Sequence, residues 1–150
     1  MLLIIGQGFE LERFDKLIKD HYKLFKDSEL IIRPYPYNWI EEQDNTIKKI
    51  SNSLTTLKIS NSSLYEEVEW CDCTLTCSTS AGIESMLMGR INAYIDLNNY
   101  LIQDPYCGKF SEEKINRLNS INDISMFMKY MKKLTLDEYN IVLNEQISEA

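Results

Sequence analysis

Short apolar runs alternate with helix-like segments along most of this 150-residue chain. Continuous apolar runs are typical of parallel strands that are buried on both faces. Amphipathic helices between such strands supply the crossover connections. The alternation therefore predicts an α/β fold with a Rossmann-like, mostly parallel sheet of about five strands and helices on both faces. The strands are expected at Leu2–Ile5, Leu30–Arg33, Thr56–Ser60, Thr74–Cys77 and Ile91–Ile95.

The helices are predicted from apolar residues that recur with helical spacing, and from capping residues at their ends. Ser63 and Glu66 have the spacing of a capping box, Thr135 with Glu138 has the same spacing, and Gly89 is placed to end a helix. The region Asp96–Phe110 is predicted to be a loop. The predicted helices are Leu11–Phe25, Trp39–Ile50, Leu64–Trp70, Ser80–Met88, Ile124–Lys133 and Leu136–Ile147.

Length and charge limit the classes of partner. We expect residues 1–150 to form a single domain. A net charge of -7 argues against a nucleic-acid partner that is bound through its phosphates. No apolar run approaches the roughly 20 residues that a membrane span needs, so no membrane insertion is expected. The run Met1–Ile5 is too short for a signal peptide, and we expect a cytoplasmic protein. Cys71, Cys73 and Cys77 lack the usual spacing of metal ligands, which favours small apolar fillers over a metal site.

The stretch Thr74–Gly89 is the strongest functional signal. It combines a buried strand, three consecutive hydroxyl side chains at Ser78–Ser80, and a helix that opens on small residues. The start of a helix favours a phosphate or another anion because its backbone N–H groups lack partners and it carries the positive end of the dipole. Gly82 is expected to let a ligand approach the backbone closely. The alternative for the hydroxyl cluster is ordinary helix capping.

Four polar or glycine-containing segments follow predicted strands directly. They are Gly6–Gly8, Arg33–Pro36, Ser60–Ser63 and Ser78–Ser80. Because the carboxyl ends of parallel strands lie at one edge of a sheet, we expect these segments to converge there on a single ligand site.

Three stretches resemble the donor-binding half of a two-domain, GT-B type glycosyltransferase of the bacterial surface-polysaccharide and sialic-acid class. They are Leu3–Gln7, Ile31–Pro36, and Ser63–Glu67 together with Cys77–Glu84. The resemblance covers about Leu2 to Ile95 and implies a nucleotide-sugar donor, with one like CMP-sialic acid favoured. It also implies that the hydroxyl cluster faces the donor phosphate and that Glu84 reaches the ribose, although a solvated Glu84 is an equal alternative.

The candidate donor- and phosphate-binding residues come from these segments. Arg33 is placed either on the donor phosphate or in a surface ion pair, and Gly6 and Gly8 are placed either on the phosphate or in a tight turn. Glu66 and Glu67 are expected on a solvated helix face. The full candidate set is Gly6, Gln7, Gly8, Arg33, Tyr35, Pro36, Ser78, Thr79, Ser80, Gly82 and Glu84.

The chain departs from the family pattern in two ways. Tyr35-Pro36 stands where the family has His-Pro, and a neutral tyrosine supplies only one hydrogen-bond donor there. The acceptor-binding half is absent, so an acceptor-binding subunit or a missing N-terminal domain is implied. The scheme requires no metal and no cofactor, and no catalytic residue is assigned. The rival hypothesis is a non-catalytic interaction domain with a transferase-like scaffold.

Overall fold

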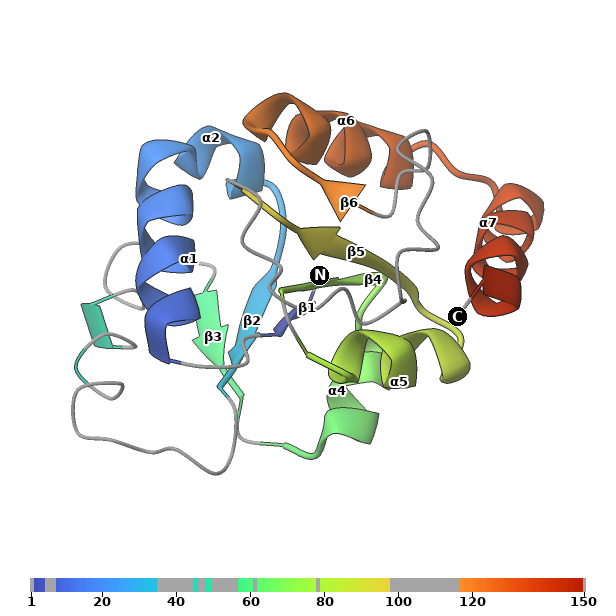
Figure 1. Ribbon diagram of the computed structural model, residues 1–150, viewed down its shortest axis with the longest axis horizontal. Helices are drawn as coiled ribbons and strands as arrows, with labels where there is room; N and C mark the ends of the chain where they lie inside the picture. Colours follow the sequence, from blue (N-terminus) through green and yellow to red (C-terminus); the bar gives the residue numbers. More distant parts are fainter. Residues whose placement is uncertain are drawn as a thin grey trace.

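Figure 1 shows the computed structural model of the chain. Most of the helix predicted over Trp39–Ile50 lies outside the residues that the structure describes, as does the predicted loop from residue 98 onward. The described residues are 2–4, 8–34, 45, 48–49, 57–60, 62–77, 79–97 and 117–149.

Six strands form one sheet in the order β3-β2-β1-β4-β5-β6, and every neighbouring pair is parallel. The α/β class and the parallel sheet are thus confirmed. The direction of strand addition reverses between β1 and β4, as in doubly wound sheets. Sequence reasoning missed β6, because a strand of two residues carries no periodic pattern. The strands are β1 (Leu2–Ile4), β2 (Leu30–Arg33), β3 (Leu57–Ile59), β4 (Cys73–Thr76), β5 (Ile91–Ile95) and β6 (Arg117–Leu118).

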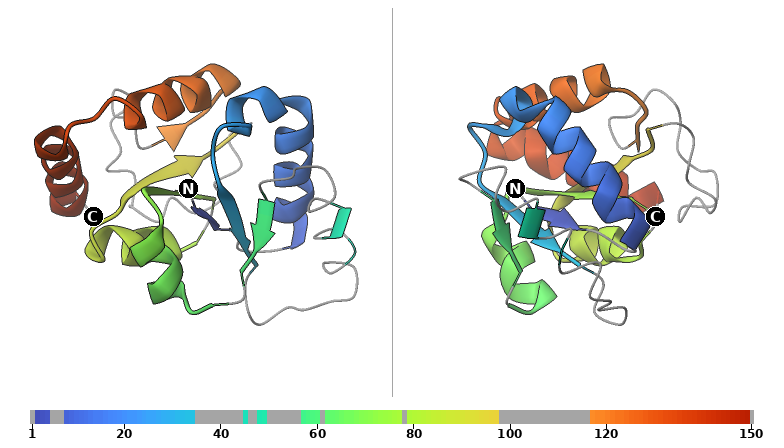
Figure 2. Two further views of the ribbon diagram at one scale, coloured as in Figure 1. Left: turned by 180° about the vertical axis from the view of Figure 1, so that it is seen from behind. Right: turned by 90° about the vertical axis from the view of Figure 1, so that its left-hand side faces the viewer.

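Helices cover both faces of the sheet. One face carries α1, α2 and α6, whereas α4 and α5 lie on the other face (Figure 1 and Figure 2). Both layers are needed because the inner strands are buried on both sides. The helices are α1 (Gly8–Asp20), α2 (Tyr22–Phe25), α4 (Leu64–Trp70), α5 (Ala81–Leu87), α6 (Ile121–Met131) and α7 (Leu136–Glu149).

Side-chain caps mark the starts of α4, α6 and α7. The predicted boxes of Ser63 with Glu66 and of Thr135 with Glu138 are present, and Gly89 ends α5 with a φ of 85°. The first predicted helix is interrupted at His21, whose φ of -128° and ψ of 32° are not helical. A capping box that was not predicted, Ser120 with Asp123, makes α6 begin three residues before the predicted Ile124.

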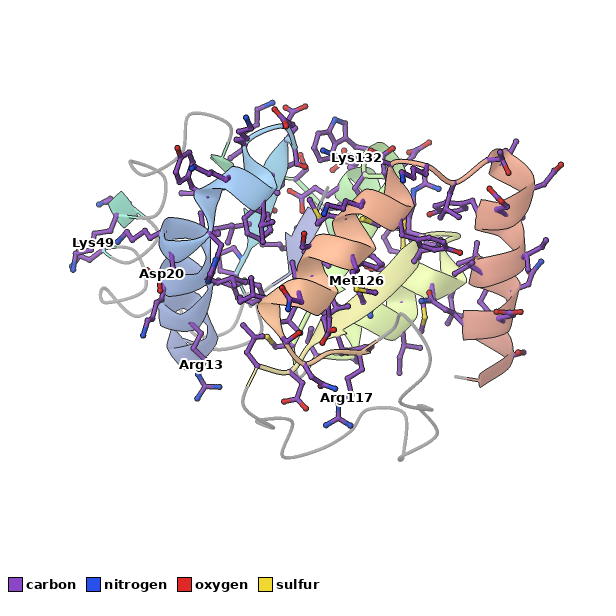
Figure 3. The ribbon with its side chains drawn as sticks, turned by 90° about the horizontal axis from the view of Figure 1, so that it is seen from above. Arg13, Asp20, Lys49, Arg117, Met126 and Lys132 are labelled. Atoms are coloured by element: carbon purple, nitrogen blue, oxygen red, sulfur yellow. The ribbon has the colours of Figure 1, made fainter. Side chains whose placement is uncertain are left out.

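The main core lies between the sheet and the layer of α1, α2 and α6. In Figure 3 the exposed side chain of Met126 marks the outer side of α6, whereas the adjacent Phe127 and Met128 are buried. The strand residues of this core are all apolar. They are Leu30, Ile32, Cys73, Leu75, Ile91, Ala93, Ile95 and Leu118.

The helix α7 covers part of β5 that β6 does not pair with. β6 is paired with Tyr94 and Ile95. Earlier in β5, Gln146 of α7 accepts a hydrogen bond from Asn92 N at 3.0 Å and donates one to Asn92 O at 2.8 Å. The Tyr139 hydroxyl likewise accepts from Ile91 N at 3.0 Å. Side chains of α7 therefore satisfy backbone groups that would otherwise need a neighbouring strand.

Candidate functional site

The carboxyl ends of the strands lie along one edge of the sheet, because every pair is parallel. This carboxyl edge contains the end of β2 at Arg33, the end of β4 at Thr76 and the end of β5 at Ile95. The helix α1 begins beside it at Gly8, and α5 begins beside it at Ala81. The reversal of strand order between β1 and β4 lies between these two helix starts, which is the usual place for a ligand crevice in such sheets.

Five of the candidate residues lie outside the described part of the chain. They are Gly6, Gln7, Tyr35, Pro36 and Ser78. Their proposed roles remain predictions. Gly8 is described as the first residue of α1.

Thr79 and Ser80 form the approach to α5. The Thr79 hydroxyl accepts a hydrogen bond from Ala81 N at 3.3 Å, so Thr79 takes part in ordering the helix start. Ser80 occupies the N-cap position, but its exposed side chain makes no capping hydrogen bond. Ordinary capping therefore accounts for one of these two hydroxyls and leaves that of Ser80 facing solvent.

Gly82 and Glu84 lie on different sides of α5. A Cβ atom added to Gly82 would lie 2.6 Å from Asn92 Nδ2 and would also overlap the Tyr94 hydroxyl. The missing side chain thus makes room for β5, which corrects the expectation that the space beside Gly82 is left for a ligand. Glu84 is exposed in the first turn of the helix, and both of its interpretations stay open.

Arg33 forms an ion pair, as one of its two predicted roles had it, but the pair is with a buried carboxylate and not at the surface. Its Nη1 donates to Glu67 Oε2 at 3.0 Å, to Ser60 Oγ at 2.8 Å and to the Ser62 carbonyl at 2.7 Å. The Glu67 side chain is only 5% exposed, so the expectation that it is solvated was wrong. The arginine holds α4 and the segment before it against the end of β2, because one guanidinium binds Ser60 and Ser62 of that segment and Glu67 of α4.

A second ion pair lies at the carboxyl edge and was not predicted. Arg117 of β6 donates to Asp96 Oδ2 through Nε at 3.0 Å and also through Nη2. The Asp96 side chain is fully buried directly after β5. An aspartate at the end of a strand was the only available signal, and it was interpreted as the start of a loop. Its partner lies 21 residues away, on a strand too short to recognise.

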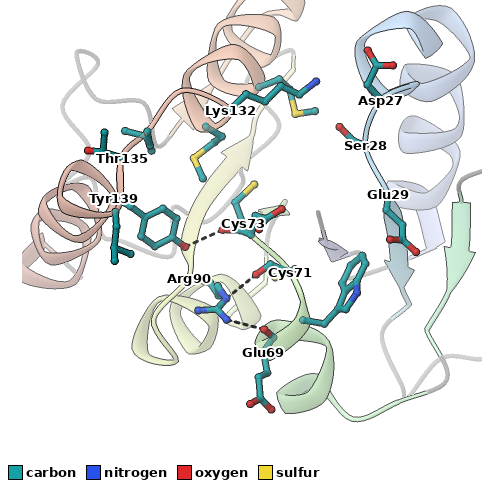
Figure 4. A pocket seen from close by; sticks show the side chains of 16 residues that line it. Asp27, Ser28, Glu29, Glu69, Cys71, Cys73, Arg90, Lys132, Thr135 and Tyr139 are labelled. Atoms are coloured by element: carbon teal, nitrogen blue, oxygen red, sulfur yellow. Dashed lines mark hydrogen bonds between the residues drawn. The ribbon is translucent and has the colours of Figure 1, made fainter.

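The amino ends of the strands form the opposite edge, which holds a groove of about 880 Å³ (Figure 4). Its lining includes Trp70, Met128, Met131 and Tyr139. The described residues that line this groove include none of the candidate donor- and phosphate-binding residues. The groove is therefore separate from the predicted site.

Four residues that line the groove have polar groups that are hydrogen-bonded or neutral, namely Arg90, Tyr139, Cys71 and Cys73. Arg90 donates through Nε to the Cys71 carbonyl and through Nη2 to the Glu69 carbonyl, each at 2.7 Å. Tyr139 donates to the Asp72 carbonyl at 2.9 Å. Burial raises the pKa of Cys71 to about 11 and the pKa of Cys73 to about 12. Both thiols therefore stay protonated near neutral pH, where a thiolate would be needed for nucleophilic attack or metal ligation.

Comparison with known proteins adds no relative. No protein-family model matches the chain, and no curated protein matches it. Among the described residues, no three His, Cys, Asp or Glu side chains lie together as a metal site. No helix in the described ranges has the length and apolar character that a membrane span requires.

Proposed function

We propose that this chain is a Rossmann-like nucleotide-binding domain that holds the nucleotide part of an activated sugar for glycosyl transfer. The observation that carries the proposal is the strand order β3-β2-β1-β4-β5-β6, whose reversal lies beside Thr79, Ser80 and the start of α1. In sheets of this order, ligands bind at the carboxyl edge beside the reversal. A CMP-sialic acid-like donor is the first choice among nucleotide sugars, on the basis of the resemblance alone.

The proposed chemistry is electrostatic. The Ser80 hydroxyl and nearby backbone N–H groups would donate hydrogen bonds to the leaving nucleotide phosphate as negative charge develops on it. Arg33 and Arg117 lie at the same edge, but each is paired with a buried carboxylate, so these two pairs add no net positive charge there. A catalytic base is not assigned. Transfer would depend on an acceptor-binding subunit or domain.

A calorimetric titration with CMP, UDP, GDP and their sugar conjugates tests the proposal. We expect one nucleotide to bind and the Ser78→Ala/Ser80→Ala variant to bind it at least tenfold more weakly. Ser148→Ala, on the exposed side of α7, is the matched control and should bind as the wild type does. Unchanged affinity in the double variant would overturn the assignment of the site.

A second candidate function is a non-catalytic interaction domain. The groove at the amino edge favours it, because Trp70 and Leu136 are 43% and 75% exposed and both line this groove. Exposed large apolar side chains beside a concave surface are typical of protein-binding sites. A folded chain that binds none of the nucleotides would favour this second function.

A further inference from the structure

The two faces of β4 and β5 have different chemistry. On the face toward α6, these strands contribute Cys73, Leu75, Ile91, Ala93 and Ile95 to the main core. Side chains alternate along a strand, so the remaining strand residues point toward α5. Those residues are Thr74, Thr76, Asn92 and Tyr94, and all four are at most 1% exposed.

A hydrogen-bonded cluster centres on Asn92. Its Oδ1 accepts from Thr74 Oγ1 at 2.8 Å and from Thr76 Oγ1 at 3.1 Å. The backbone of Asn92 is held separately by the side-chain amide of Gln146. Asn92 is therefore fixed in position from both β4 and α7.

The other end of the Asn92 side chain lies beneath the first turn of α5. A Cβ atom on Gly82 would lie 2.6 Å from Asn92 Nδ2 and would also overlap the Tyr94 hydroxyl, so both side chains occupy the space beside the glycine. Nδ2 is buried and has no hydrogen-bond acceptor among the described residues. A buried donor without an acceptor costs stability, and a well-packed apolar group of similar shape would avoid that cost.

We propose that Asn92 is a positioning residue for the nucleotide site, and this inference rests on the function proposed above. Together with the Tyr94 hydroxyl, the Asn92 amide limits how closely α5 approaches β5 at Gly82. Thr79 and Ser80 directly precede α5, so the same contact sets their position at the carboxyl edge. Displacements well below the size of an atom matter at such a site, because hydrogen bonds to a ligand depend steeply on geometry.

The test is the Thr74→Val/Thr76→Val/Asn92→Leu variant, which replaces the cluster with apolar groups of similar shape. The shape is similar, but a leucine methyl group is slightly larger than the amide NH2 group that it replaces, so α5 should move outward slightly. We expect a midpoint of thermal unfolding equal to that of the wild type or higher. We also expect at least a tenfold loss of affinity for CMP, UDP or GDP, whichever the wild type binds. Amide hydrogen exchange across Gly82–Ser85 should be faster.

Ile91→Val is the matched control, because Ile91 lies on the same strand and faces the opposite core. It should lower the thermal midpoint slightly and leave nucleotide affinity unchanged. Equal affinity in the folded triple variant would overturn the inference and leave the proposed function standing. A large fall in the thermal midpoint would also overturn it, because the cluster would then be part of what stabilises the fold. A wild type that binds no nucleotide would overturn the proposed function and the inference together.

Discussion

The carboxyl edge and the amino edge of the sheet satisfy their buried polar groups in different ways. At the carboxyl edge, the carboxylates of Glu67 and Asp96 are buried and each is paired with an arginine. At the amino edge, Arg90 binds backbone carbonyls, and the buried cysteines are neutral. Charged side chains are costly to bury unless they are paired. The two edges therefore differ in how their buried groups are satisfied: buried ion pairs lie at the carboxyl edge, whereas the amino edge has backbone hydrogen bonds and neutral thiols.

Breaking the Arg33–Glu67 pair should have the largest effect. Arg33→Met leaves the buried Glu67 carboxylate without its cation, and we expect the free energy of unfolding to fall by about 2–3 kcal/mol. Urea unfolding measures this. The control is Lys58→Met, since Lys58 and Glu29 form an exposed ion pair with side chains 63% and 47% exposed. That variant should change stability by less than about 0.5 kcal/mol. Equal losses of stability in the two variants would contradict the expectation that an ion pair with a buried carboxylate matters more than an exposed one.

The neutral thiols of the amino edge predict a loss of stability at high pH. Burial raises the pKa of Cys71 and Cys73 above their ordinary value of 9.0. Their contribution is therefore fully present below pH 9 and is lost as the pH rises toward about 11, because the unfolded thiols ionise first. We expect about 2 kcal/mol of that loss between pH 8 and pH 10. The Cys71→Ala/Cys73→Ala variant should lose less over this range. A parallel decline in both proteins would show that other groups cause it.

Loosening the attachment of α7 at the amino edge should lower the free energy of unfolding by less than the two changes above. Tyr139→Phe removes a hydroxyl that accepts from Ile91 N and donates to the Asp72 carbonyl. We expect the free energy of unfolding to fall by about 1–2 kcal/mol, because the backbone groups lose their partner. Tyr65→Phe is the control, since Tyr65 is 71% exposed on α4. Its effect on urea unfolding should be close to zero, and an equal effect of both changes would contradict the role of Tyr139.

The smallest effect is expected at the cap of α4, beside the carboxyl edge. Ser63→Ala removes the hydroxyl that accepts from Glu66 N at 3.3 Å. We expect a loss of about 1 kcal/mol in urea unfolding. Ser62→Ala should leave stability unchanged, because Arg33 binds the Ser62 carbonyl and not its hydroxyl.

The hydrogen bonds from Ser63 lower the pKa of Glu66, so this cap is present at neutral pH and weakens as the pH falls through that lowered pKa. If the loss of stability in Ser63→Ala did not depend on pH, the Glu66 carboxylate would not contribute to the capping box.

Sequence reasoning recovered the features that depend on neighbouring residues. The apolar runs that predicted the strands correspond to β1–β5 within one or two residues, and the capping box of Ser63 with Glu66 is present. It missed β6 and the early start of α6. Two residues carry no periodicity, and the predicted start of α6 rested on the apolar pattern and overlooked the cap at Ser120.

The pattern of apolar runs, helical spacing and caps was enough to specify an α/β chain with a parallel sheet, because each of these signals acts within one strand or one helical turn. The partners of Arg33 and Asp96 were settled only by folding, since they lie 34 and 21 residues away along the chain. The need for a glycine at position 82 of α5 likewise depends on Asn92 and Tyr94, which lie on β5. Such contacts form because the sheet brings distant segments together, and no local pattern records which segments will meet.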